Sequence, residues 1–240
     1  MSIFTSDEPV DLSEHMLSTY QTLRITLVVI ALAVPWLLAI GDYVLTGQFE
    51  LRNSMSAYYG GPMRNWFVGV LFAISGLLGA YKGFRPAENV ALNLAAIFAV
   101  LTAVFPSEPG RWIHGVVAII FFLCIAYVCI FAASATLSLV KDEKRKNAYR
   151  RTYKLLGALM VLSPVVAAIL STFLGLHTSY IFFAEAVGVY AFAIYWWVKT
   201  REIRETNADR KAAQGEIELQ AGKGASDAVR ELQVAQTTAS

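Results

Sequence analysis

Glu185 is the residue of this sequence whose chemistry most needs explaining. It is the single charged side chain between residues 155 and 198, a run of 44 residues. A carboxylate inside so long an apolar run must be paired, protonated or turned toward water. Gly188 follows three residues later, on the same side of a helix, and we expect it to open space beside the carboxylate. Glu185 is therefore either a hydrogen-bonded contact between two helices or a binding site for a proton, a cation or a head group.

Further polar residues that can bind a ligand lie in two stretches beside apolar runs. Residues 45–64 are rich in hydroxyl and aromatic groups, and His114 opens a later apolar run. Serine and tyrosine hydroxyls bind polar ligands, and the guanidinium of Arg64 is able to hold a lipid phosphate by two parallel hydrogen bonds. Arg64 has the alternative role of a snorkelling anchor at the membrane surface. The candidate ligand-binding residues are Ser56, Tyr58, Tyr59, Arg64, His114 and Glu185.

Enzymatic chemistry is an alternative use of the same residues. Zinc accepts histidine and carboxylate ligands, and the candidates of those types are Asp42, His114, His177 and Glu185. They stand singly, without the H-x-x-x-H or H-E-x-x-H spacing of helical zinc sites. A triad that joins a loop serine to His114 and Glu185 lacks a G-x-S-x-G motif. We therefore assign no catalytic residue and expect neither a metal nor a cofactor.

The elements that must position these residues are membrane helices. A bilayer core takes about 20 apolar residues as helix, and the stretch 175–179 supplies a turn that divides the long run after residue 155. The sequence predicts an all-α, polytopic membrane helix bundle with six transmembrane helices. Their expected ranges are 25–44, 65–81, 89–105, 112–140, 155–174 and 179–198.

The distribution of Lys and Arg predicts the orientation of these helices. With six spans, 17 of the 20 basic residues fall on the side that carries both termini. Basic residues accumulate in cytoplasmic segments, so we expect both termini in the cytoplasm. The same topology places residues 45–64, His114 and Glu185 together at the outer face. Glu185 then lies ~9–10 Å below the outer end of its helix.

The composition excludes several other classes of protein. Hydrophobic residues make up 56% of the chain and charged residues 16%, against about 25% charged in soluble domains. So little charge excludes a soluble globular enzyme and a disordered chain, and the net charge of +2 excludes a nucleic-acid-binding protein. We expect a multi-pass protein of the bacterial cytoplasmic (inner) membrane, in contact with membrane lipid and without a nucleic-acid partner.

The chain divides into three regions. Residues 1–22 are a polar cytoplasmic lead, residues 23–199 the six-helix transmembrane domain, and residues 200–240 a charged cytoplasmic tail that is partly helical and then disordered. Small residues recur on two faces of the membrane domain, and they let helices approach closely, within the bundle or in a homo-oligomer. One face runs from Gly69 to Gly83, and the other consists of Ala91, Ala95, Ala99 and Ala103.

Several strings between residues 50 and 130 carry a family resemblance. They include Ser54-Met55-Ser56-Ala57-Tyr58-Tyr59, Tyr81-Lys82-Gly83 and His114-Gly115. In these strings the chain resembles a group of uncharacterised bacterial six-span membrane proteins. It is more distantly similar to the DRAM and Sfk type of six-helix membrane protein, which includes lipid-remodelling factors. It is also similar to the CREST membrane hydrolases in combining a serine, an acidic residue and a histidine at helix ends, but it lacks their paired H-x-x-x-H.

Three functions are compatible with these observations. The first is recognition of a lipid or small ligand in an outer-face polar pocket. The second is metal-dependent hydrolysis in the membrane by the same residues. The third is a carrier coupled to a proton or cation through Glu185.

Overall fold

A computed structural model describes residues 12–106, 112–172 and 179–214 of the chain. All regular elements among these residues are helices, which confirms the predicted all-α class. In chain order they are α1 (Leu12–Thr46), η1 (Ser56–Gly60), α2 (Arg64–Ala80), α3 (Pro86–Val104), α4 (Trp112–Tyr127), η2 (Val128–Ala132), η3 (Ala133–Ala135), η4 (Leu137–Leu139), α5 (Glu143–Thr172), α6 (Tyr180–Thr206) and α7 (Ala208–Ala213).

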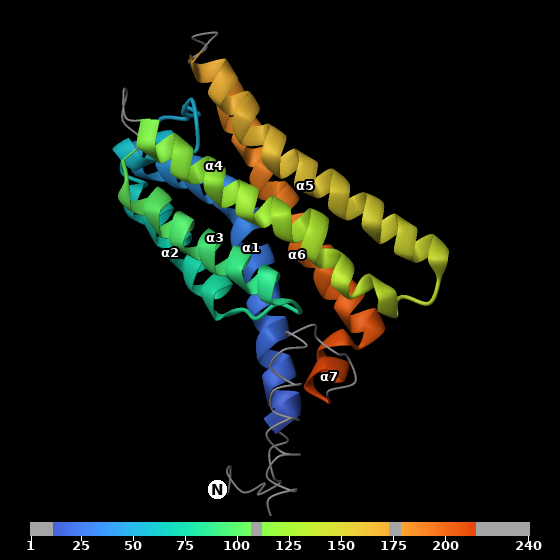
Figure 1. Cartoon of the computed structure of the whole chain (residues 1–240). Coiled ribbons are helices and arrows are strands. Elements are labelled where there is room, and N and C mark those ends of the chain that lie inside the picture. The colour runs from blue at the N-terminus through green and yellow to red at the C-terminus, as the bar shows by residue number, and fades with distance from the viewer. Residues whose placement is uncertain (1–11, 107–111, 173–178, 215–240) are drawn as a thin grey trace, which may run out of the picture.

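The long helices run beside one another and connect two ends of the molecule (Figure 1). At one end, which we call the loop end, residues 47–63 (loop 1) are hydrogen-bonded to the first turns of α6. At the other end, which we call the terminal end, the turn between α2 and α3 meets the early part of α1 through a hydrogen bond from Arg24 to Tyr81. The short helix α7 also lies there, where Asp209 pairs with Arg24.

α1 illustrates how an apolar helix packs in this bundle, because both of its faces are apolar. The buried face consists of Leu27, Ala31, Val34 and Leu38. The exposed face consists of Val29, Leu32, Trp36 and Ile40. A helix that is apolar all round belongs inside a large core or a membrane, so the second face of α1 is suited to lipid.

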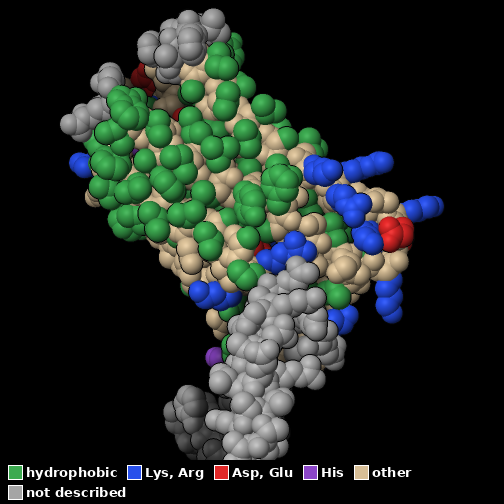
Figure 2. Space-filling model, viewed as in Figure 1, with side chains coloured by type: hydrophobic (Ala, Val, Ile, Leu, Met, Phe, Trp, Pro, Cys, Tyr) green, Lys and Arg blue, Asp and Glu red, His purple; other side chains and the backbone are tan. Residues whose placement is uncertain are grey.

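Exposed large apolar side chains occur on each of the long helices. Figure 2 shows hydrophobic side chains over most of the visible face, with Lys and Arg gathered at the terminal end. Five helical segments are long and apolar enough to cross a membrane, and α2 is a shorter apolar helix of 17 residues. This is the construction of an integral membrane protein.

Helices α1, α5 and α6 are longer than the apolar runs that predict them. α1 begins at Leu12, within the predicted polar lead, and α5 begins at Glu143, within a basic stretch. α6 continues to Thr206, beyond the predicted end of the last span. The apolar run 112–140 instead loses its α-helical form after Tyr127. The cause of the longer helices is that charged residues such as Lys, Arg and Glu are good helix formers outside the membrane.

The two small-residue faces differ in their surroundings. All four alanines of the face on α3 are buried, as the close-packing expectation requires. On α2, in contrast, Gly69, Ala73, Gly76 and Ala80 are exposed. A Cβ added at Gly69 or at Gly76 would meet nothing within 4 Å. Gly79 of the same face packs on α3, where a Cβ would lie 3.8 Å from Ala96. Only the exposed part of the face on α2 therefore has no partner within the described part of the chain.

Candidate functional site

Loop 1 is a folded segment with its own polar contacts. Arg52 pairs with Asp42 at the end of α1 through two hydrogen bonds, of 3.0 and 3.1 Å. The hydroxyls of Ser54 and Ser56 lie 3.1 Å apart, and the Ala57 amide donates to the Ser54 hydroxyl. These contacts shape the turn that leads into η1, so two of the predicted hydroxyl groups already take part in local structure.

Glu185 holds this loop against α6. Its carboxylate accepts a 2.6 Å hydrogen bond from the Met55 amide, and the backbone of Ser56 interacts with the same carboxylate. One turn earlier, the Phe182 amide donates to the Asn53 carbonyl at 2.9 Å. A half-buried carboxylate that receives backbone amide hydrogen bonds has the partner that its position requires.

Tyr58 anchors the loop from within. Its side chain is fully buried, with the ring 6.2 Å from that of Phe182. Burial raises the pKa of the Tyr58 hydroxyl above its ordinary value, because the charged form is poorly solvated there. The Arg52 guanidinium lies 5.4 Å from the ring centroid. Tyr58 therefore supports the loop and does not face solvent as a ligand group.

Arg64 and Tyr59 form the exposed part of the loop end. The Arg64 guanidinium donates a 3.0 Å hydrogen bond to the Tyr59 hydroxyl and lies 4.6 Å from the centroid of its ring. Arg64 is the first residue of α2, whose first turn contains no acidic residue and whose N-cap, Met63, makes no side-chain cap. Among the described residues no carboxylate pairs with Arg64. Two sources of positive potential, a guanidinium and a helix N-terminus, are thus adjacent, and no acidic residue of the described ranges balances them.

His114 occupies a different position from the other five candidates. It is buried at the start of α4, with Nδ1 2.9 Å from the Phe105 carbonyl and the ring beside Phe67. His114 and Arg64 therefore bind other groups, and the Glu185 carboxylate is hydrogen-bonded to the Met55 amide. Arg111 and His177 lie outside the described residues.

Gly188 also differs from its expected role. A Cβ at this position would overlap the Ser163 hydroxyl on α5 and would lie 3.3 Å from the Phe122 ring. The glycine therefore allows α6 to pack closely on α5 and α4. It does not open space beside Glu185.

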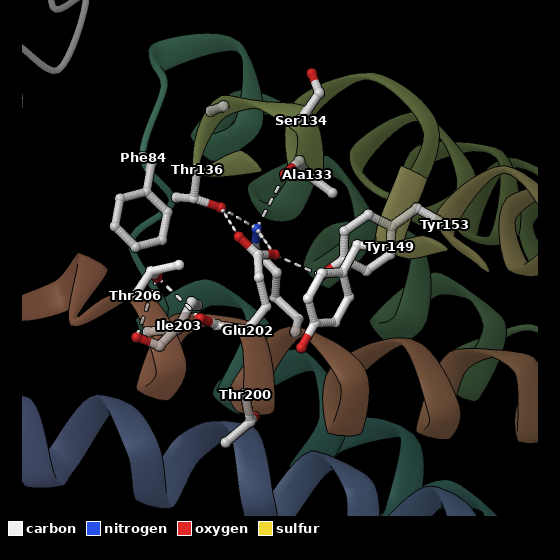
Figure 3. A network of polar contacts seen from close by, with 12 residues as sticks. Phe84, Ala133, Ser134, Thr136, Tyr149, Tyr153, Thr200, Glu202, Ile203 and Thr206 are labelled. Atoms are coloured by element: carbon white, nitrogen blue, oxygen red, sulfur yellow. Dashed lines mark hydrogen bonds and ion pairs between the residues drawn. The ribbon is translucent and has the colours of Figure 1, made fainter. Parts of the chain in front are cut away.

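A second polar cluster lies at the terminal end, centred on Lys199 and Glu202 of α6 (Figure 3). Their side chains are 1% and 0% exposed, and the Nζ–Oε2 distance is 2.9 Å. Lys199 also donates to the Thr136 hydroxyl at 2.6 Å and to the Ala133 carbonyl at 3.0 Å. Thr136 and Tyr153 donate to the Glu202 carboxylate. Both charges are fully hydrogen-bonded, as burial requires.

The turn between α2 and α3 is held by a similar arrangement. Glu88 accepts a 2.8 Å hydrogen bond from the Phe84 amide, and Asn89 accepts one of 2.6 Å from the Gly83 amide. Arg85 is the N-cap of α3, so Glu88 stands at the capping-box position three residues later. A Cβ at Gly83 would overlap the Glu88 side chain, which explains the glycine there.

A cleft of about 250 Å³ opens at the terminal end, between the start of α1 and the α6–α7 junction. Two ion pairs join its walls: Arg24 with Asp209 at 2.6 Å, and Arg210 with Glu14. This is the end opposite to loop 1, so the cleft is not the predicted outer-face pocket. The candidate site at the loop end is instead a surface formed by loop 1 and the start of α2.

Sequence reasoning missed the Lys199–Glu202 cluster because both residues stand where the apolar run ends. Lys199 directly follows the last predicted span, and Glu202 belongs to the predicted charged tail. The sequence does contain one signal. Lys199 and Glu202 are three residues apart just after Trp196 and Trp197, and this spacing places them on one face of a helix.

Comparisons with protein families, with curated proteins and with solved structures found no match to this chain.

Proposed function

We propose that this integral membrane protein crosses the membrane six times, with both termini in the cytoplasm, and binds an anionic lipid head group or a small anionic ligand at its outer face. Arg64 is the central binding residue, and Tyr59 positions its guanidinium. Glu185, Ser56 and Tyr58 hold loop 1 in the shape that presents this pair. A bacterial inner membrane is the location that we infer for it.

The connections of α2 support six crossings. α2 starts beside loop 1, which contacts the start of α6, and ends at Tyr81, which contacts Arg24 early in α1. If α1 and α3 both cross the bilayer, α2 must cross it to join them. Its 17 residues measure about 25 Å as a helix, and the flanking Arg64 and Lys82 are able to snorkel across the remaining thickness.

The observation that carries the binding proposal is the positive charge at the start of α2, which no described carboxylate balances. A cation is unfavourable at a helix N-terminus, because the free amides there already attract anions. The Arg64 amide already donates to the Gly61 carbonyl. An anion bound by the Arg64 guanidinium and by the amides of the next residues of α2 relieves this conflict. The neighbouring Trp66 is 56% exposed, as is typical of a side chain at the head-group level of a bilayer.

The test is lipid binding by the purified protein, measured by native mass spectrometry with phosphatidylglycerol and with phosphatidylcholine. We expect preferential binding of phosphatidylglycerol, and we expect Arg64→Gln to weaken it about tenfold, the value of a charge-assisted contact. Lys82→Gln is the matched control, because Lys82 is an exposed cation at the opposite end of α2. The affinity of Lys82→Gln for phosphatidylglycerol should equal that of the wild type.

Soluble glycerol phosphate separates the two sources of the anion. Binding of glycerol phosphate that depends on Arg64 identifies a small anion as the ligand, and binding of the lipid alone identifies a head group. Equal lipid affinity in the wild type and in Arg64→Gln would contradict the proposal.

The two alternative functions have less support. Among the described residues, no group of three His, Cys, Asp or Glu side chains is placed to hold a metal ion, as the hydrolase would require. The carrier hypothesis requires Glu185 to exchange a proton or cation, whereas the Met55 amide engages its carboxylate.

A further inference from the structure

The path of the chain after α4 is irregular at a place where its sequence does not require it. Residues 128–132 form a π-helical turn, and two short 3-10 segments follow at 133–135 and 137–139. Sharp departures from an α-helix usually have a proline, a glycine pair or an inserted side chain as their cause. Residues 128–139 contain neither proline nor glycine. Within the segment, the Ser134 and Ser138 hydroxyls donate to the Phe131 and Ala135 carbonyls, which weakens a regular helix. A further contact reaches the segment from outside.

The Lys199 side chain is the inserted group. Its ammonium binds the Ala133 carbonyl, which lies at the change from π-helical to 3-10 geometry, and the Thr136 hydroxyl three residues later. Both contacts join α6 to the irregular segment. They supply hydrogen bonds to backbone and side-chain groups that a regular α-helix would satisfy internally.

Glu202 makes the insertion of Lys199 tolerable. A lone ammonium so deeply buried would be strongly unfavourable, and the carboxylate balances its charge at 2.9 Å. Glu202 is itself bound by the hydroxyls of Thr136 and Tyr153, from the irregular segment and from α5. Glu88, on α3, also interacts electrostatically with Lys199. Three elements thus meet at one ion pair.

We propose that residues 128–139 are a two-state element controlled by the Lys199–Glu202 pair. With the pair engaged, the segment is broken as described. With the pair removed, the segment extends α4 as a regular α-helix, because apolar sequences without proline or glycine favour internal backbone hydrogen bonds in a membrane. This change moves the link at 140–142 and the start of α5, whose basic residues Lys144, Arg150 and Arg151 are exposed. The buried pair therefore sets the position of the basic surface at the terminal end.

Hydrogen exchange of the full-length protein in detergent, followed by mass spectrometry, tests this proposal. In the variant Lys199→Met/Glu202→Met, which removes both charges together, we expect amide exchange across residues 128–139 to slow about tenfold. Exchange in α1 and α3 should stay as in the wild type. The control Lys154→Met changes an exposed lysine of α5 and should leave residues 128–139 unaffected.

Two outcomes overturn the proposal. One is unchanged or faster exchange in residues 128–139 of the double variant while α1 and α3 keep their protection. If the double variant does not fold, Thr136→Val provides the second arm, because it removes one bridging hydroxyl and no charge. It should slow exchange in the same segment, and unchanged or faster exchange in the folded Thr136→Val protein would also overturn the proposal.

Discussion

Carboxylates that bind backbone amides of a turn recur at both ends of this protein. Glu185 accepts from the Met55 amide of loop 1, and Glu88 accepts from the Phe84 amide in the turn before α3. In each case a helical side chain satisfies amides that a turn leaves unpaired. Glu185 thus acts as a positioning residue for the loop that presents Arg64.

Removing the Glu185 carboxylate should loosen loop 1. We expect Glu185→Ala to lower the free energy of unfolding by about 1.5–3 kcal/mol, the value of a hydrogen bond to a charged group. Amide exchange should accelerate in residues 53–58. Glu185→Gln should have a smaller effect, because its amide oxygen still accepts from Met55. Slow exchange of the loop in Glu185→Ala would show that this contact does not hold it.

A substitution at Gly83 tests how closely the turn between α2 and α3 approaches the Glu88 side chain. Gly83→Ala should destabilise the protein by about 1–3 kcal/mol, because the added methyl group overlaps Glu88 and overpacking costs that much. Gly76→Ala is the matched control, since a Cβ there meets nothing within 4 Å. Thermal unfolding in detergent distinguishes them. Equal melting temperatures for the two variants would contradict the described packing of Glu88 on Gly83.

The sequence predicts the placement of individual residues only in part. An isolated carboxylate in an apolar run is recognisable as a contact residue, and Glu185 makes such a contact. Its partner was not predictable, because a backbone amide has no sequence signal. The Lys199–Glu202 cluster is not predictable for a related reason. Thr136 is 63 residues from Lys199 along the chain and Tyr153 is 49 residues from Glu202, and only the fold brings them together.

At the scale of elements, small residues decide how closely helices pack. The alanines of α3 line a buried ridge, and Ala95 and Ala99 are fully buried. Gly157 on α5 has the same role, because a Cβ there would overlap Ile130. Close contact of this kind replaces the hydrophobic effect as the main attraction between helices in lipid.

Enlarging the α3 ridge should destabilise the bundle. We expect Ala95→Leu to cost about 1–3 kcal/mol, because the added carbons force α3 away from its neighbours. Ile97→Leu, at a position 54% exposed, is the control with nearly no effect. Differential scanning measurements in one detergent compare them. Wild-type stability in Ala95→Leu would show that the alanine ridge of α3 does not lie at a helix–helix interface.

The exposed small face of α2 is where we propose a homo-oligomer. Gly69, Ala73, Gly76 and Ala80 recur at helical spacing and have no partner in the described chain. Ala73→Leu should shift the protein toward the monomer in native mass spectrometry and leave its melting temperature unchanged. Ile97→Leu serves again as the control. An unaltered distribution of oligomers in Ala73→Leu would exclude this face.

Hydropathy predicts the all-α class well, but it does not predict where the helices end. The apolar runs mark where helices lie in a membrane, yet α5 and α6 extend into charged segments that hydropathy assigns to loops and tail. The break after Tyr127 was equally unpredictable, because its cause is a side chain from α6. Both differences arise from interactions outside the local sequence.

The whole molecule has two chemically different ends separated by an apolar band. The loop end presents Arg64 and Tyr59 on a folded loop, and the terminal end carries the buried ion pairs and the basic start of α5. This asymmetry agrees with the distribution of Lys and Arg along the sequence, which favours the terminal end as the cytoplasmic one.

The most direct test of this account is the side of the membrane on which each end lies. Single cysteines at the exposed positions Gln48, Lys82 and Lys144 are to be labelled in intact cells with a membrane-impermeant maleimide. The six-span topology predicts labelling of Gln48→Cys in intact cells, and labelling of Lys82→Cys and Lys144→Cys only after permeabilisation. The wild type, whose Cys124 is half-buried and whose Cys129 is buried, is the background control. Labelling of Gln48→Cys and Lys82→Cys from the same side would contradict a crossing by α2 and with it the outer-face site.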